Sequence, residues 1–297
     1  MKQKKIFALG FFDGVHKGHQ MVLHLCQHLA DDAGVATAAI TFDRHPQSLF
    51  TPTPPALLNT TEDRRLLIQE WAGIEHLLIL PVNEQVMTMP WQDFLEALLE
   101  EGAVGFVCGY DFRFGKNGEG NAEKMAAFAE GRGLPWCIVD EQAMDGEKIS
   151  STRIRVLIEK GDMEGAKELL GHFHMFTGKV VPGRGLGHTI GIPTANLHLP
   201  GELVCPAFGV YACKAVVDGN WYNAVTNIGT RPTVNGQNVT VEPWILDFSG
   251  NLYDRELTLQ FYQFLRPEKK FDSLEELKQE ISKNAAQTRA IFAETDY

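Results

Sequence analysis

Two histidines near the start of the chain, His16 and His19, have the types and spacing to bind phosphate. They follow a short apolar run, residues 6–9, and a glycine-rich turn. A strand, a tight turn and a helix start in that order leave unpaired backbone N–H groups and the positive end of the helix dipole facing an anion. Glycines let the backbone approach that anion closely, and this turn contains Gly10, Gly14 and Gly18. The pattern predicts a phosphate site at residues 10–19.

Two later loops also come directly after predicted strands. Residues 42–50 follow a predicted strand and contain His45 and Pro46, but taken alone they are better explained as an ordinary loop. Residues 109–121 interleave glycines, aromatic rings and cations, which suits a ring system beside a phosphate; a flexible surface loop explains this composition equally well. Gly115-Lys116 is not a P-loop, because the upstream glycine and the following Ser or Thr are missing.

A fourth segment points to a second phosphate contact. Three hydroxyl residues and two arginines gather at a predicted helix start, namely Ser150, Ser151, Thr152, Arg153 and Arg155. Backbone N–H groups at a helix start and guanidinium groups both bind phosphate. An N-cap would need only one hydroxyl, so helix capping does not account for the whole set.

The second half of the chain has its own glycine-rich segment, residues 183–196, which ends in Pro193, Thr194 and Asn196. Its glycine spacing fails the dinucleotide-binding pattern and no clear helix follows, so a dinucleotide site is a poor explanation. Glu242 lies in a predicted strand, and from the residues alone it is explained as a solvent-facing strand glutamate.

The elements that would position these residues change character near the middle of the chain. Up to about residue 170, strand-like and helix-like patterns alternate, which is typical of a doubly wound parallel sheet covered by helices on both faces. Strands are predicted at residues 35–42, 77–82, 104–109 and 136–139, of which 77–82 and 104–109 should be buried. A helical stripe runs through Val22, Leu25, Cys26 and Leu29 with Gly34 as its C-cap, and further helices are predicted around 93–101, 122–130, 152–160 and 163–170. Ligands of such sheets bind beyond the carboxyl ends of the strands, where the loops described above fall.

After residue 173 the hydrophobic pattern becomes period two, which predicts an antiparallel barrel or sandwich. Asp218-Gly219, between residues 210–217 and 221–228, is a strong hairpin signal, and Ser249-Gly250 separates two further strands. Residues 274–292 form a long amphipathic helix. We predict an α/β domain at 1–172 and a β-barrel domain with a terminal helix at 173–297.

Charge and composition exclude several classes of function. The 297-residue chain has a net charge of −11, which argues against nucleic acid or an anionic membrane as partner, because its field repels polyanions. The five cysteines are scattered, so neither a disulfide scaffold nor structural zinc is expected. No stretch reaches transmembrane length and the first apolar run is too short for a signal peptide, so we expect a cytoplasmic protein. Nothing indicates an obligatory protein partner. Asn59-Thr60-Thr61 matches a glycosylation acceptor, which this location discounts.

The turn at 10–19 and the segment Ile149 to Arg155 together resemble the FMN-adenylylating module of the prokaryotic bifunctional riboflavin kinase/FMN adenylyltransferase (FAD synthetase) family. The resemblance implies catalytic roles for His16 and His19. It implies ATP contacts at Gly10, Phe11, Phe12, Asp13, Gly14, His16, Gly18, His19, Ser150, Ser151, Thr152 and Arg155. It also implies that the loops at 42–50 and 109–121, called the ring-binding loops below, shape the flavin and nucleotide pockets. The flavin contacts would be His45, Pro46, Gly109, Asp111, Phe112, Arg113 and Phe114.

Residues 183–196 resemble the glycine-rich loop and Pro-Thr-Ala-Asn motif of riboflavin kinase. The resemblance implies Glu242 as catalytic base and Mg²⁺ at Thr194 and Asn196. It further implies nucleotide contacts at Gly183, Gly185, Gly187, Thr194 and Asn196, and flavin contacts at Arg266 and Phe271. Riboflavin, FMN, FAD and ATP would be the small-molecule partners, used first by a kinase and then by an adenylyltransferase.

The kinase half departs from the family pattern at Pro243-Trp244, Asp254 and Asn284. An FAD synthetase with an impaired kinase half is therefore the alternative hypothesis. A flavin-binding regulator without turnover is a third, although binding alone needs neither a base nor paired histidines. A nucleic-acid-binding module conflicts with the acidic charge.

Overall fold

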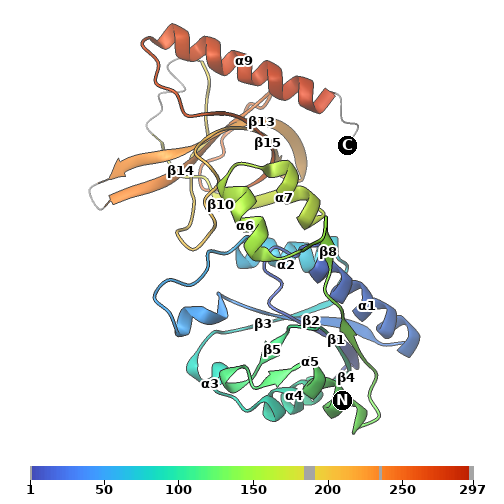
Figure 1. The fold of residues 1–297 in the computed structure, drawn as a ribbon. Helices are drawn as coiled ribbons and strands as arrows, with labels where there is room; N and C mark the ends of the chain where they lie inside the picture. The colour runs from blue at the N-terminus through green and yellow to red at the C-terminus, as the bar shows by residue number, and fades with distance from the viewer. Residues whose placement is uncertain (1, 184–190, 234–235, 294–297) are drawn as a thin grey trace. The chain divides into compact units, whose positions relative to one another are not determined.

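The computed structural model describes residues 2–183, 191–233 and 236–293, which form two compact units, Met1–Ser151 and Thr152–Tyr297 (Figure 1). Each unit is built around its own sheet. The first sheet is parallel and the second antiparallel, so the predicted change of character along the chain is confirmed.

The first unit holds a five-stranded parallel sheet with the order β3-β2-β1-β4-β7. Its strands are β1 (Lys5–Leu9), β2 (Ala36–Phe42), β3 (His76–Leu80), β4 (Ala103–Gly109) and β7 (Trp136–Val139). The central β1 is buried along its whole length. The prediction that β3 is a buried strand is wrong: within the described sheet it pairs with β2 alone, and as an edge strand it is half-buried.

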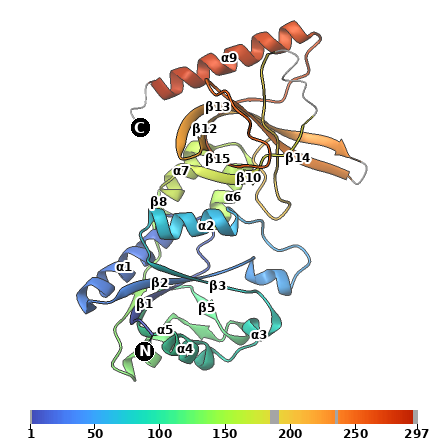
Figure 2. The same cartoon turned by 180° about the vertical axis from the view of Figure 1, so that it is seen from behind.

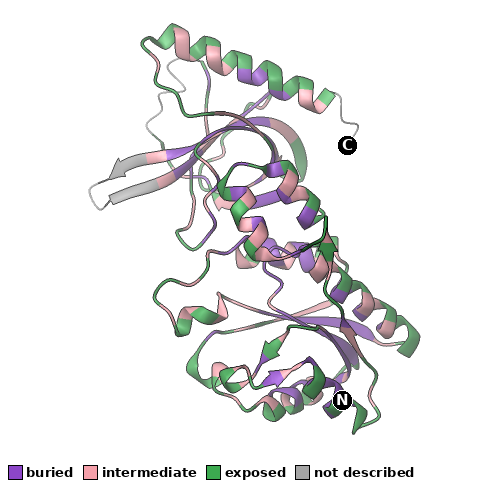
Figure 3. Cartoon of the chain, viewed as in Figure 1, coloured by how far each residue is buried: buried purple, intermediate pink, exposed green. Residues whose placement is uncertain are grey.

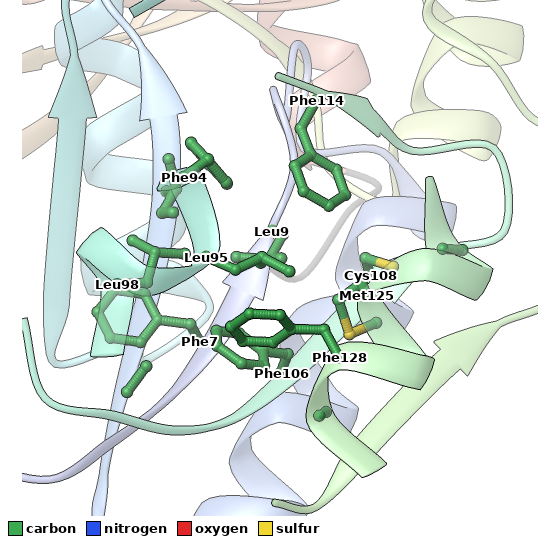
Figure 4. Close-up of a cluster of buried hydrophobic side chains, with 14 of the residues drawn as sticks. Phe7, Leu9, Phe94, Leu95, Leu98, Phe106, Cys108, Phe114, Met125 and Phe128 are labelled. Carbon is green, nitrogen blue, oxygen red and sulfur yellow. The ribbon is translucent and has the colours of Figure 1, made fainter. Parts of the chain in front are cut away.

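Helices cover both faces of this sheet. Side chains along each strand point alternately to opposite faces, and both faces of the buried β1 must therefore be covered. Phe7 and Leu9 of β1 pack with α4 (Trp91–Glu100) and α5 (Ala122–Glu130) in the core drawn in Figure 4. On the other face, Cys26 of α1 (Lys17–Ala33) donates to the Ile6 carbonyl. Gly34 ends α1 in the left-handed conformation at φ 63°, as predicted for its C-cap.

Short elements carry the loops of the first unit. They are η1 (Pro46–Leu49), α2 (Thr61–Leu66), the π-helical η2 (Leu67–Trp71), α3 (Glu84–Met87), β5 (Arg113–Phe114), η3 (Lys116–Gly118), β6 (Gly120–Asn121), β8 (Ala143–Met144) and β9 (Glu147–Lys148). η1 follows β2, and β5 follows β4, so both ring-binding loops leave the carboxyl ends of strands.

The second unit is a six-stranded antiparallel sheet with the order β10-β15-β12-β13-β14-β11. The two end strands, β10 and β11, come into contact, so the sheet forms a nearly closed barrel, as predicted (Figure 2). Its elements are α6 (Ser151–Glu159), α7 (Met163–Leu170), β10 (His174–Lys179), β11 (Leu197–His198), β12 (Gly209–Val217), β13 (Asn220–Thr233), β14 (Gly236–Ile245), β15 (Glu256–Pro267) and α9 (Leu274–Ala293). α9 packs on β12 and β13. In Figure 3 the buried residues follow the strands of both sheets, and the exposed ones lie mainly on helices and loops.

The turns at Asp218-Gly219 and Ser249-Gly250 connect their flanking strands in different ways. Asp218 and Gly219 are left-handed, at φ 52° and 77°, and join β12 to β13 in a tight antiparallel hairpin. Ser249-Gly250 does lie between two strands, but β14 pairs with β13 and β11, whereas β15 pairs with β10 and β12. The strands that flank this turn therefore belong to different parts of the sheet and do not form a hairpin. Among the described helices, none is long and apolar enough to cross a membrane.

Candidate active sites

The turn between β1 and α1 brings the two histidines together. His16 is the N-cap of α1, and its Nδ1 accepts a hydrogen bond from the His19 backbone N–H at 3.3 Å. The two imidazole rings stack with centroids 3.6 Å apart, and Phe12 meets the His19 ring edge-on at 5.4 Å. Both rings therefore lie at the positive end of the α1 dipole, as the phosphate-site prediction requires.

Electrostatics keep His19 neutral near pH 7. Burial, with smaller contributions from the nearby His16 and Arg64, holds the pKa of His19 well below its usual value. Arg64 on α2 is itself fully buried. Burial lowers the pKa of its guanidinium to about 10, while Asp13 and Asp43 act in the opposite direction. Arg64 therefore stays charged at pH 7, and a neutral His19 ring can still donate one hydrogen bond to a phosphate.

The serine segment reaches the same turn. The Ser151 hydroxyl donates to the Asp13 carbonyl at 2.9 Å, so Ser151, the last residue of the first unit, contacts the turn that carries the histidines. Ser150 directly precedes it in the first unit. Thr152 and Arg155, also predicted to bind the nucleotide, belong to the second unit, where they occupy the first turns of α6. The remaining turn residues, Gly10, Phe11, Gly14 and Gly18, surround the histidines in sequence, and Gly14 is left-handed at φ 82°.

A cavity of about 710 Å³ lies between the two ring-binding loops of the first unit. Three of the predicted flavin contacts line it: Pro46, Arg113 and Phe114. Phe42 and Phe50 add further rings to its wall. An aromatic cavity with one guanidinium suits a planar, partly polar ring system.

The other predicted flavin contacts do not line this cavity. Phe112 stacks on Phe114 with centroids 5.4 Å apart, so it supports the wall from behind. His45 caps η1 through the Gln47 N–H at 3.1 Å and meets the Phe11 ring edge-on. Asp111 accepts from Lys148 at 2.5 Å, and Gly109 ends β4. These four residues belong to the same loops but are not among the residues that line the space.

In the second unit, a cavity of about 420 Å³ opens between the barrel and α9. Glu242 and Trp244 of β14 line it, and so does Asn227, which stands opposite Glu242 on β13. The Thr240 hydroxyl donates to the Glu242 carboxylate at 3.1 Å. Glu242 thus lies on the wall of an otherwise largely apolar space, where a carboxylate can accept a proton from a bound hydroxyl.

A second cavity, of about 450 Å³, borders the first at Thr194, which lines both. Pro243 and Ile245 face this second space, because alternate residues of a strand point to opposite faces. β14 continues through Pro243, whose carbonyl accepts from the Ala195 N–H at 2.9 Å. The departure at Pro243 therefore does not interrupt the strand that carries Glu242.

Asn196 presents an unused oxygen next to this region. Its side chain is buried, and Oδ1 has no hydrogen-bond partner among the described residues. A Cβ at Gly183 would overlap the Asn196 amide, so any other residue at position 183 would displace that side chain. Gly185 and Gly187, also predicted to contact the nucleotide, lie outside the described residues. A buried amide oxygen and a nearby hydroxyl are hard ligands of the kind that Mg²⁺ prefers.

The predicted flavin contacts of the kinase half lie on the same cavity as Glu242. Arg266 donates from Nε to the Asn284 side chain at 3.1 Å and lies 3.4 Å from Glu280. The Phe271 ring is 5.7 Å from its guanidinium. Asn284 is 2% exposed, so this departure from the family pattern sits in a buried contact with Arg266. The third departure, Asp254, is left-handed at φ 64°, a conformation that aspartate tolerates.

The sequence prediction missed several residues on these walls. Trp244 could have been found, because it lies two positions after Glu242 and hence on the same face of the strand. Asn227 needed the β13–β14 register. In the first unit, Val86 and Met87 come from the short helix α3, for which no motif gave a signal.

Comparison with known proteins matches both halves. A family model described as FAD synthetase matches residues 1–153, and one described as riboflavin kinase matches residues 170–292. A bifunctional riboflavin kinase/FMN adenylyltransferase of Listeria monocytogenes is 36% identical over 296 residues, which cover 98% of this chain and 94% of that protein. Proteins with the same description from Bacillus subtilis and Escherichia coli K12 are each 33% identical, over 98% of this chain and 93% of theirs.

A solved structure shares the fold. A crystal structure described as a macrolide-efflux protein from Streptococcus pneumoniae superposes with a TM-score of 0.86 at 29% identity, and the match covers 97% of this chain and 95% of that one. The family models and the relatives agree on the order of the two halves along the chain. This chain belongs to the bifunctional riboflavin kinase/FMN adenylyltransferase family.

Proposed function

We propose that the chain divides two successive reactions between a domain at 1–172 and a domain at 173–297, both acting in the cytoplasm. As a member of its family, the enzyme phosphorylates riboflavin to FMN and adenylylates FMN to FAD, with ATP as co-substrate in both reactions. The bifunctional names of the relatives favour this function over an FAD synthetase with an impaired kinase half.

The kinase reaction is assigned to the cavity that Glu242 lines. Glu242 accepts the proton of the terminal riboflavin hydroxyl, whose oxygen then forms a bond to the γ-phosphorus of ATP while the bond to the ADP oxygen breaks. Arg266 and Phe271 hold the flavin, and the second cavity holds the nucleotide. One observation carries this assignment: Thr194 lines both cavities, so the two co-substrates would meet beside Glu242.

We assign Mg²⁺ to Thr194 and Asn196 in the kinase site, since the Asn196 oxygen is buried and unused among the described residues. A bound divalent cation there would neutralise charge on the ATP phosphates. The protein's own contribution is to orient those phosphates through the loop that begins at Gly183.

The adenylylation reaction is assigned to the β1–α1 turn. An oxygen of the FMN phosphate forms a bond to the α-phosphorus of ATP, and pyrophosphate leaves with its bridging oxygen. His16 and His19, together with the backbone N–H groups of the turn, hydrogen-bond the phosphates and stabilise the charge that develops there. Ser150, Ser151, Thr152 and Arg155 complete the contacts to the triphosphate, and the 710 Å³ cavity takes the flavin ring.

Two altered chains test these assignments. With riboflavin, ATP and Mg²⁺, the His19→Asn/Ser151→Ala chain should accumulate FMN but form FAD at least ~100-fold more slowly, because transition-state hydrogen bonds are lost. The Glu242→Gln chain should leave riboflavin unphosphorylated, yet convert added FMN to FAD at the normal rate. Chromatography of the flavin products distinguishes these outcomes. FAD synthesis by the first chain at the unaltered rate would refute the site.

A further inference from the structure

The β1–α1 turn has a strained backbone conformation, which contacts from other parts of the chain must stabilise. Phe12 and Val15 both have positive φ, at 57° and 42°. Such values are costly for residues with a side chain, and most of all for a β-branched one such as Val15. The turn places His16 and His19, so whatever holds these two residues in place also sets the histidine geometry.

Two buried hydrogen bonds from a segment 45 residues later hold this turn. The Asn59 side-chain oxygen Oδ1 accepts from the Gly14 N–H at 2.9 Å. In the opposite direction, the Leu58 N–H donates to the Asp13 carboxylate at 2.8 Å. Asn59 is 1% exposed, so water does not compete for its oxygen. Together these bonds fix the two residues that lie between Phe12 and Val15.

The same segment is anchored on its other side by the next helix. Thr60 caps α2 by accepting from the Asp63 N–H at 3.0 Å. One turn later, Arg64 donates to the Phe42 carbonyl at 2.7 Å, and its guanidinium lies 4.6 Å from the Phe11 ring. Asn59 is therefore held between a capped helix and the phosphate turn, and it is outside the wall of the flavin cavity.

We infer that Asn59 is a positioning residue for adenylyl transfer, which acts by fixing the Gly14 amide and thereby the histidine turn. This inference rests on the proposed function of that turn. Asn59 touches no substrate in this account. Its loss should change the rate of the chemical step while FMN affinity stays the same, since a small displacement of catalytic groups is costly.

A matched pair of substitutions tests the acceptor itself. Asn59→Thr keeps an oxygen that can accept from Gly14, whereas Asn59→Val has nearly the same shape without it. We expect the kcat of FMN adenylylation to fall at least ~tenfold in Asn59→Val and to stay within about threefold of normal in Asn59→Thr, with the KM for FMN unchanged in both. Riboflavin phosphorylation by the same chains should be unchanged.

Gln27→Ala is the structural control, because Gln27 makes a comparable bond, to the Ala72 carbonyl at 2.8 Å, away from the turn. It should lower the free energy of unfolding without lowering kcat. Equal kcat in Asn59→Val and Asn59→Thr, a normal kcat in Asn59→Val, or an equal loss in Gln27→Ala would overturn the inference. If the unaltered chain makes no FAD from FMN and ATP, the proposed function fails instead, and the two failures are thereby distinguished.

Discussion

At the scale of single residues, the first site places a buried cation near one neutral ring, that of His19. Arg64 is fully buried, and two of its nitrogens, Nε and Nη1, have no hydrogen-bond partner in the described parts of the chain. Its charge is one cause of the lowered pKa of His19, after burial and His16. The site can thus attract phosphate through the fixed charge of Arg64, while the His19 ring, which we propose to contact the phosphate, stays unprotonated.

Replacing Arg64 by Met should raise the pKa of His19 toward its ordinary value of about 6.5 without reaching it, because the burial contribution remains. NMR titration of the histidine rings measures this shift. Arg65→Met is the control, since Arg65 pairs with Glu62 at 2.7 Å on the surface of the same helix. An unchanged His19 pKa in Arg64→Met, or an equal shift in the control, would contradict the electrostatic account.

The same titration has a consequence for stability. Below pH 6.5 an unfolded His19 binds a proton that the folded one does not, so the contribution of His19 to stability falls as the pH drops through this window and is complete above it. His19→Asn should therefore lose less stability than the unaltered chain between pH 6.5 and 5, as measured by urea unfolding.

Residues of these sites differ in how far the sequence predicts them. The histidines and the serine segment could be predicted, because their chemistry depends on local order: strand, turn and helix start. Asn59 could not, since its function depends on a contact with Gly14 across 45 residues. In the sequence it belongs only to a glycosylation triplet. Arg64 looks like one of two ordinary helix arginines until its burial is known.

At the scale of elements, α9 forms one wall of the kinase cavity. Ile281 and Asn284 of this helix line the cavity, and Asn284 holds Arg266 of β15. Ala285 packs into a small core with Val210 and Val225. The helix therefore contributes both apolar packing and the hydrogen bond that fixes a proposed flavin contact.

Asn284→Ala should raise the KM for riboflavin about five- to tenfold, equivalent to ~1–1.4 kcal/mol, the net contribution of a typical single hydrogen bond. FMN adenylylation should be unaffected. Ser282→Ala on the same helix removes a bond to the Lys278 carbonyl away from the cavity and should leave both reactions unchanged. Steady-state kinetics of the two reactions check this. A normal riboflavin KM in Asn284→Ala would show that Arg266 needs no such support.

The sequence predicts the helices, strands and turns better than it predicts which strands pair with each other. Helix periodicity, the Gly34 cap and the Asp218-Gly219 turn are local signals, and each matches the structure. The placement of β15 between β10 and β12 is not local, so no signal at Ser249-Gly250 reveals that the strands on either side of it do not pair with each other. The half-burial of β3 likewise follows from its place at the sheet edge, which an apolar run does not reveal.

At the scale of the whole molecule, each unit contains the complete lining of its own described cavities. A chain that can only phosphorylate riboflavin should therefore supply free FMN to a second chain that can only adenylylate it. When the Glu242→Gln chain and the His19→Asn chain are mixed with riboflavin, ATP and Mg²⁺, FAD should form after a lag during which FMN accumulates. Product chromatography over time follows both flavins. No FAD from the mixture, with each remaining reaction intact, would mean that FMN must stay on one chain.

The position of Thr194 between two cavities has a use beyond the enzyme's own substrates. Thr194 belongs to the walls of both the proposed flavin space and the proposed nucleotide space. A synthetic compound that joins riboflavin to adenosine through three phosphates, one more than the pyrophosphate of FAD, would bridge both spaces at once. Such a bisubstrate inhibitor would gain affinity from each half, because the second half binds at the high effective concentration set by the linker.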